Sequence, residues 1–147
     1  MTGGWPAQFE RVQRWYRRAS MTTDPTDRID FLYAFFENAF HLRDWLQDTG
    51  GATATDLQAF FDAHEDMRLC RDLANSHKHY SISHPSQPIP PSEAREYSPG
   101  TGNLGTDVSL VILSDGKQHN PFELAGRVLR LWEGFISAGD TGGVSPP

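Results

Sequence analysis

Apolar residues recur along this chain at the spacing of amphipathic helices, and they predict four helical segments. In the first segment the stripe has one apolar residue every three or four positions. The second segment is apolar over more than half of its circumference, so we expect a central helix that is buried on several sides. The predicted segments cover about residues 7 to 19, 24 to 47, 55 to 75 and 120 to 138.

Two of these helices have clear start signals. Asp24 followed by Pro25, and Asn120 followed by Pro121, each combine an N-cap side chain with a proline at the first helical position. An aspartate or asparagine oxygen can accept a hydrogen bond from the free N–H groups of the first turn. We therefore expect the second and fourth helices to begin at these two pairs.

The third helix has a less simple pattern. Thr55 and Gln58 resemble a capping box, which places its start near residue 55. Its apolar stripe then shifts near His64, so we expect a break or kink there. The stripe comprises Leu57, Phe60 and Phe61 before the shift and Met67, Cys70, Leu73 and Ala74 after it.

Between the third and fourth helices the pattern is no longer helical. Residues 85 to 105 contain five prolines and three glycines, which predicts a long loop. Residues 108 to 113 read as a strand that ends in a turn, with residues 80 to 84 or part of the loop as its antiparallel partner. The sequence thus predicts one all-α domain over residues 1 to 138, an antiparallel four-helix bundle with a small β-hairpin insertion before the last helix. Residues 139 to 147 are expected to be a disordered tail.

Composition narrows the class of protein. No apolar run approaches the length of a membrane span, and the first residues lack the apolar core of a signal peptide. The single cysteine, Cys70, has no partner for an internal disulfide and is typical of a reducing compartment. We therefore expect a cytoplasmic protein that does not associate with membranes.

The formal net charge of −6 argues against a protein that coats nucleic acid through bulk charge. The basic residues are nevertheless clustered, so local basic patches are possible on an acidic protein. One cluster lies in the first helix, at Arg11, Arg14, Arg17 and Arg18. It is either a solvated face or a phosphate-binding surface.

The richest chemistry lies in "RLCRDLANSHKHY", residues 68 to 80. In a continuous helix, Arg71, Asn75 and His79 share one polar stripe, whereas His77 falls on the apolar side. One interpretation is a solvated helix end with a packed histidine. The other is a site, and bringing Arg71 and His77 together would require the helix to unwind after about Ala74.

Two segments carry a resemblance to the HEPN superfamily. Arg71-Asp72 followed by "LANS" and His77 resembles the arginine–polar–histidine mark of that superfamily, near the end of the third helix. "FFENAFHLRDW" and "CRDLANSHKH" are together similar to a group of small bacterial HEPN-like proteins. That group shows a His-Leu-x-Asp-Trp helix and a helix end of the form D-x-A/C-N-x-x-K-H.

The resemblance implies a metal-independent endoribonuclease of a bacterial defence or toxin–antitoxin type. It implies a homodimer in which two copies of the site meet in one cleft, with RNA as substrate and a cognate protein as a further partner. Arg71 would bind phosphate and His77 would move protons, with Asp72, Asn75 and His79 in support. No cofactor or metal is expected for this reaction.

Which histidine matters stays open at this point. In the look-alike group the shared feature is the asparagine and the Lys-His end, and the arginine is often missing. His79, preceded by Lys78, is then the matching histidine rather than His77. This alternative favours a non-catalytic HEPN-like binding module, which would use the 85 to 105 loop or the arginines of the first helix.

A third hypothesis concerns the polar strip of the second helix. Glu37, His41 and Asp44 are spaced along one side, and with His77 or His79 they suggest a metal-binding bundle. The Glu-x-x-His pairs of di-iron bundles are absent from the sequence. A structural role is the other reading, in which His41 and Asp44 hydrogen-bond to the Asn75/His79 end of the third helix.

Overall fold

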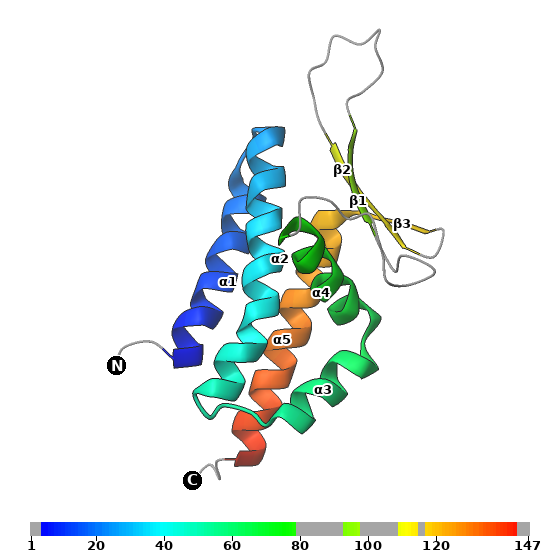
Figure 1. The fold of residues 1–147 in the computed structure, drawn as a ribbon. Helices are drawn as coiled ribbons and strands as arrows, with labels where there is room; N and C mark the ends of the chain where they lie inside the picture. The colour runs from blue at the N-terminus through cyan, green and yellow to red at the C-terminus, as the bar shows by residue number, and fades with distance from the viewer. Residues whose placement is uncertain (1–3, 79–92, 98–108, 115–116, 144–147) are drawn as a thin grey trace, which may run out of the picture.

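The computed structural model describes residues 4–78, 93–97, 109–114 and 117–143, and this part of the chain is predominantly helical. Figure 1 shows two long helices side by side, with the remaining helices packed along them and a small sheet at one end. The helices are α1 (Gly4–Met21), α2 (Pro25–Asp48), α3 (Ala54–Ala63), α4 (Glu65–Lys78) and α5 (Pro121–Gly143). None of these described helices combines the length and apolar character needed to cross a membrane.

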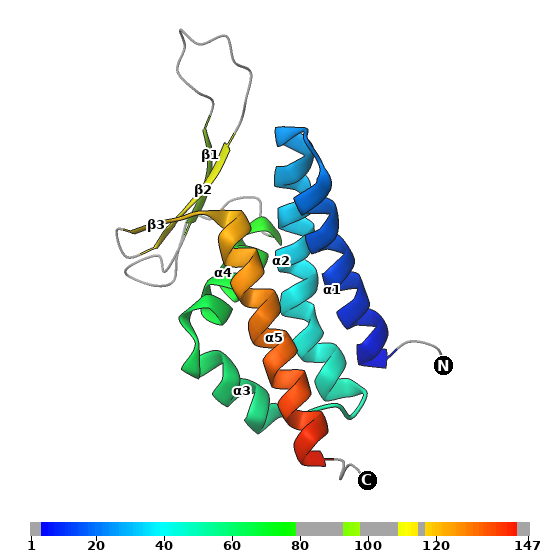
Figure 2. The same cartoon turned by 180° about the vertical axis from the view of Figure 1, so that it is seen from behind.

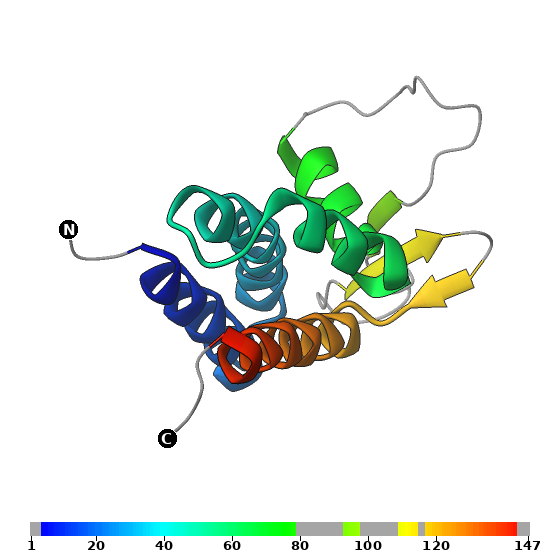
Figure 3. The ribbon, with the colours of Figure 1, turned by 90° about the horizontal axis from the view of Figure 1, so that it is seen from below.

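The expected central position of α2 is confirmed. Seen from below, α1, α5 and the α3–α4 pair surround it (Figure 3), and α2 contacts every other helix. Trp132 of α5 is fully buried and donates an indole N–H to the Ala39 carbonyl of α2, 3.0 Å away. The buried residues of α2 are Ile29, Leu32, Phe35, Phe36, Ala39, Leu42 and Leu46.

Two helices begin where the sequence predicts, and a third, α3, begins at a different N-cap residue. The Asp24 carboxylate accepts hydrogen bonds from the first turn of α2, and Asn120 does the same for α5. The N-cap of α3 is Thr53 rather than Thr55, and its hydroxyl accepts from the N–H of Asp56 at 3.1 Å. The predicted cap at Thr55 was wrong because a capping box was sought with Glu or Gln three residues after the cap. Three residues after Thr53 the chain has Asp56.

The predicted break at His64 is confirmed and divides the third expected helix into α3 and α4. His64 has an extended backbone (φ −128°, ψ 115°) and its N–H closes the last turn of α3 on the Phe61 carbonyl. The His64 carbonyl in turn accepts from the N–H groups of Met67 and Arg68. One residue thus ends one helix and begins the next, which accounts for the shift of the apolar stripe.

The insertion contains a three-stranded antiparallel sheet, seen from both sides in Figures 1 and 2. Its strands are β1 (Glu93–Tyr97), β2 (Ser109–Ser114) and β3 (Lys117–His119), in the order β1-β2-β3. Glu93 pairs with Leu113 and Tyr97 with Ser109, so the predicted strand at 108 to 113 is confirmed within one residue. Its partner lies inside the 85 to 105 segment, which is therefore not wholly a loop. The alternative partner, residues 80 to 84, lies outside the described residues.

The last helix is longer than expected. α5 extends to Gly143, so the tail predicted from residue 139 begins within a helix. The prediction ended the helix at residue 138 because glycines at 139, 142 and 143 disfavour a helix. Residues 144–147 of that predicted tail lie outside the described part of the chain.

Candidate functional site

One face of α4 is fixed in the core, as its stripe predicted. Met67, Cys70, Leu73 and Ala74 are at most 4% exposed. The Cys70 thiol lies 3.5 Å from the Phe36 carbonyl of α2. Burial, and secondarily the charge of Asp72, raise the pKa of the Cys70 thiol far above its ordinary value, which makes this cysteine inert.

The opposite face of α4 presents Arg71 and Asp72. The Arg71 Nε lies 3.4 Å from the Asp72 Oδ1, and the two side chains are 33% and 16% exposed. Adjacent residues of a helix project about 100° apart, so they cannot form a well-aligned two-point ion pair. Within the described residues the guanidinium thus makes one long contact, to Asp72, and it retains access to solvent.

The supporting polar residues are exposed. Asn75 lies one turn beyond Arg71 and is exposed, as are His41 and Asp44 on α2. Among the described residues no hydrogen bond links His41 or Asp44 to Asn75, so the structural role predicted for that pair is wrong for Asn75. The reason is the packing of α4 on α2 through Cys70 and Phe36, which leaves His41 and Asp44 on a solvent-exposed side of α2.

The end of α4 does not unwind. Its backbone remains helical through Asn75 and Ser76 to Lys78, so the unwinding that would bring Arg71 and His77 of one chain together does not occur. Leu73 and Ala74 are buried in the core at this point, and that packing outweighs the local competition of Asn and Ser side chains for backbone hydrogen bonds. The side chains of His77 and Lys78, and the whole of His79, lie outside the described residues, so their predicted roles stay predictions.

Metal ligation finds no support in the described residues. No group of three histidine, cysteine, aspartate or glutamate side chains within them is placed to hold an ion. His41 and Asp44 are both among these residues. The predicted metal site also needs His77 or His79, and the side chains of these two residues lie outside the described part of the chain.

The arginines of α1 behave differently from one another. Arg18 stacks over Trp15, with its guanidinium carbon 4.8 Å from the ring centroid, and Arg11 donates to the side chain of Gln8. Arg14 and Arg17 are exposed and make no ion pair within the described chain. These two cations are free to meet a phosphate or an acidic partner.

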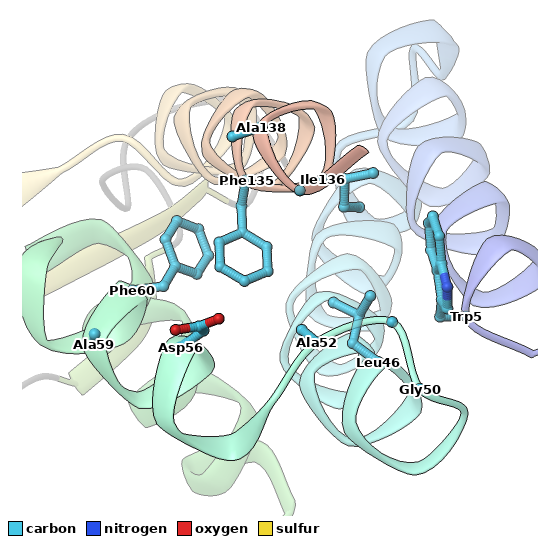
Figure 4. A pocket seen from close by; sticks show the side chains of 12 residues that line it. Trp5, Leu46, Gly50, Ala52, Asp56, Ala59, Phe60, Phe135, Ile136 and Ala138 are labelled. Carbon is cyan, nitrogen blue, oxygen red and sulfur yellow. The ribbon is translucent and has the colours of Figure 1, made fainter. Parts of the chain in front are cut away.

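Figure 4 shows a pocket that the sequence did not reveal. The segments that line it, at the start of α1, around the α2–α3 connection and near the end of α5, lie at the end of the helices far from the sheet in Figure 1. Its volume is about 700 Å³, within the range of small-molecule sites. Three chain segments far apart in sequence form it, so no local pattern announces it. It is lined by Trp5, Leu46, Gly50, Gly51, Ala52, Asp56, Ala59, Phe60, Phe135, Ile136, Ala138 and Gly139.

Comparison of the chain with protein-family models, with curated proteins and with solved structures gives no significant match. The HEPN resemblance therefore stays a prediction carried by the two sequence segments. The predominantly helical architecture is the part of the expectation that the structure supports.

Proposed function

We propose that this protein is a metal-independent endoribonuclease of the HEPN-like kind, acting through the polar face of α4. The observation that carries the proposal is the contrast across one helix. Met67, Cys70 and Leu73 lock α4 in the core, while Arg71 on the other side has a partly exposed guanidinium held beside Asp72. A rigid helix that presents a pre-positioned arginine is suited to binding a phosphate.

The loose contact between Arg71 and Asp72 favours substrate binding over a purely structural pair. Asp72 meets the guanidinium through one nitrogen at 3.4 Å, and the other guanidinium donors have no partner among the described residues. A phosphodiester can accept two of these hydrogen bonds at once, which is the stronger arrangement. RNA can therefore displace Asp72 from Arg71, and Asp72 keeps the arginine oriented until it does.

The remaining steps fall to a histidine. Attack by the RNA 2′-hydroxyl on its own phosphate requires removal of one proton and donation of another, and imidazole titrates near neutral pH. His77 is the proposed acid–base group. Because α4 stays helical to Lys78, the proposal has His77 of one copy meet the phosphate bound by Arg71 of the other copy, across the dimer cleft. Asn75, Lys78 and His79 support it around the phosphate.

The HEPN resemblance also proposes a homodimer whose two α4 ends share one cleft. Among the residues whose side chains the structure describes, Trp45 and Met21 are the large apolar ones left exposed, at 37% and 72%. Trp5 and Trp15 are partly buried against the core and so offer less surface to a partner. Sedimentation at several concentrations should show a dimer, and a monomer with full activity would contradict the shared cleft.

The test is cleavage of end-labelled RNA by purified protein in excess EDTA. Wild type, His77→Ala and His79→Ala are compared at matched folded fractions, with His41→Ala as the control for loss of an exposed histidine. We expect His77→Ala to lose cleavage and His41→Ala to retain it. Loss in His79→Ala alone would transfer the acid–base role to that residue, and cleavage unaffected in all three variants would refute the proposal.

The free arginines of α1 favour a second candidate, a non-catalytic RNA- or protein-binding module. Arg14 and Arg17 are exposed without ion pairs in the described chain, as a phosphate-binding surface requires. This reading predicts salt-dependent RNA binding without cleavage. It also predicts that Arg14→Ala with Arg17→Ala weakens binding while Arg71→Ala does not.

A further inference from the structure

We propose that the pocket between α3 and α5 is a binding site for a small organic ammonium ion with an apolar body. The site lies at the opposite end of the helices from the sheet and shares no residue with the proposed α4 site. It therefore constitutes a separate function, and neither proposal depends on the other.

Aromatic rings form one wall of the pocket. Phe60 stacks on Phe135 with ring centroids 4.6 Å apart and an interplanar angle of 28°. Phe60 also contacts Trp132 and His64, with centroid distances of 5.0 and 5.3 Å. This ring is thus held from three sides, and the electron-rich aromatic faces of such a wall attract cations.

The opposite wall is shaped by a glycine turn. Gly50 has a φ of +82°, a conformation that suits glycine, and it places Gly51 against Trp5. A Cβ at Gly51 would lie 2.6 Å from the Trp5 Cδ1 and 2.8 Å from the Leu46 Cδ2. Trp5 can pack here only because residue 51 has no side chain, so this turn fixes the width of the pocket.

Asp56 supplies the charge. It is the one ionisable side chain among the residues that line the pocket, and Figure 4 shows its carboxylate beside Phe60 and Phe135. The backbone N–H of Asp56 donates a hydrogen bond to the Thr53 hydroxyl. The Asp56 carboxylate itself has no hydrogen bond or ion pair within the described residues.

These features together select the class of ligand. A carboxylate without a basic partner disfavours an anion, and a neutral apolar ligand would leave it unmatched. An ammonium group beside Asp56 would pair with the carboxylate. An apolar body attached to it would pack against Phe60, Phe135 and Leu46. The net charge of −6 on the chain further favours a cation.

The test uses phenyltrimethylammonium as the probe and its neutral isostere tert-butylbenzene for comparison. Binding is followed by the backbone amide NMR shifts of the full chain. We expect saturable binding at about 1 mM or tighter, with the largest shifts at Gly50, Gly51 and Ala59. The neutral isostere should bind at least about tenfold more weakly, because it lacks the charge that Asp56 meets.

Asp56→Asn should weaken binding of the cation at least about tenfold, since it removes the charge but keeps the side-chain shape. Asp62→Asn is the matched control, an exposed aspartate of the same helix that does not line the pocket. Equal binding by Asp56→Asn and wild type, equal binding of the neutral isostere, or no saturable shift at these amides would overturn the proposal. Arg71→Ala should bind the probe normally, which separates this result from the nuclease assay.

Discussion

The two sides of α4 differ in almost every physical respect. The side facing α2 is apolar, at most 4% exposed, and carries a thiol that burial keeps protonated. The other side carries Arg71, Asp72 and Asn75, and the Arg71 side chain is 33% exposed. One helix can thus contribute stability through one face and the proposed chemistry through the other. Substitutions on the two faces should therefore have separable effects.

The largest effect should come from the buried face. Leu73→Ala removes a side chain that is 2% exposed and leaves a cavity against α2, which should lower the free energy of unfolding by about 2–5 kcal/mol. Urea denaturation followed by circular dichroism measures this. A loss below about 1 kcal/mol would show that α4 is not anchored as described.

Arg71→Ala should affect RNA cleavage strongly and stability little, the reverse of Leu73→Ala. RNA cleavage should fall by about 100-fold or more, because a donor that stabilises the charged transition state is lost. The free energy of unfolding should change by less than about 1 kcal/mol, since a partly exposed contact between neighbours contributes little. Arg71→Lys keeps the charge without the two-point geometry and should restore only part of the rate.

A matched arginine tests the specificity of that loss. Arg130 on α5 is exposed, and Arg130→Ala should leave cleavage unchanged. Equal losses in Arg71→Ala and Arg130→Ala would point to a general effect of positive charge rather than to a site on α4.

The buried thiol predicts a pH dependence of stability. The folded state raises the pKa of Cys70 above its ordinary value of 9.0, so its contribution is complete below pH 9 and declines as pH rises. Above about pH 9 the free energy of unfolding should fall as pH rises because of this group, by about 1 kcal/mol between pH 9 and pH 10. Denaturant titrations of wild type and Cys70→Ala at pH 8, 9 and 10 measure it, and parallel declines in both proteins would contradict it.

The smallest effect should lie away from α4. Asn120→Ala removes the side-chain acceptor that meets the Glu123 N–H at 3.0 Å, and should lower the free energy of unfolding by about 1 kcal/mol. RNA cleavage should remain at the wild-type level. A loss of cleavage at full folding would indicate that the start of α5 takes part in the site.

Much of the fold could be predicted from local signals. The caps at Asp24 and Asn120, the apolar circumference of α2 and the break at His64 each depend on residues close in sequence, so the pattern contains them. The position of β1 within the 85 to 105 segment could not be predicted, because "EAREY" becomes a strand through pairing with β2 rather than through its own composition.

Part of the candidate site could likewise be predicted from local sequence, and part could not. Helical spacing placed Cys70 in the core and Arg71 outside it, as the structure has them. The continuation of α4 past Asn75 was missed because core packing overrides local side-chain preferences. The pocket was missed because Trp5, Phe60 and Phe135 meet only in the folded chain.

The most direct test of the α4 account is the chemistry of the RNA ends that wild-type protein leaves in excess EDTA. Attack by the 2′-hydroxyl with proton transfer by a histidine must leave a 2′,3′-cyclic phosphate and a 5′-hydroxyl. We expect these ends from wild type, and at least about 100-fold less of them from Arg71→Ala. Products bearing a 3′-hydroxyl and a 5′-phosphate, or cleavage that appears only when a divalent metal is added, would contradict the account.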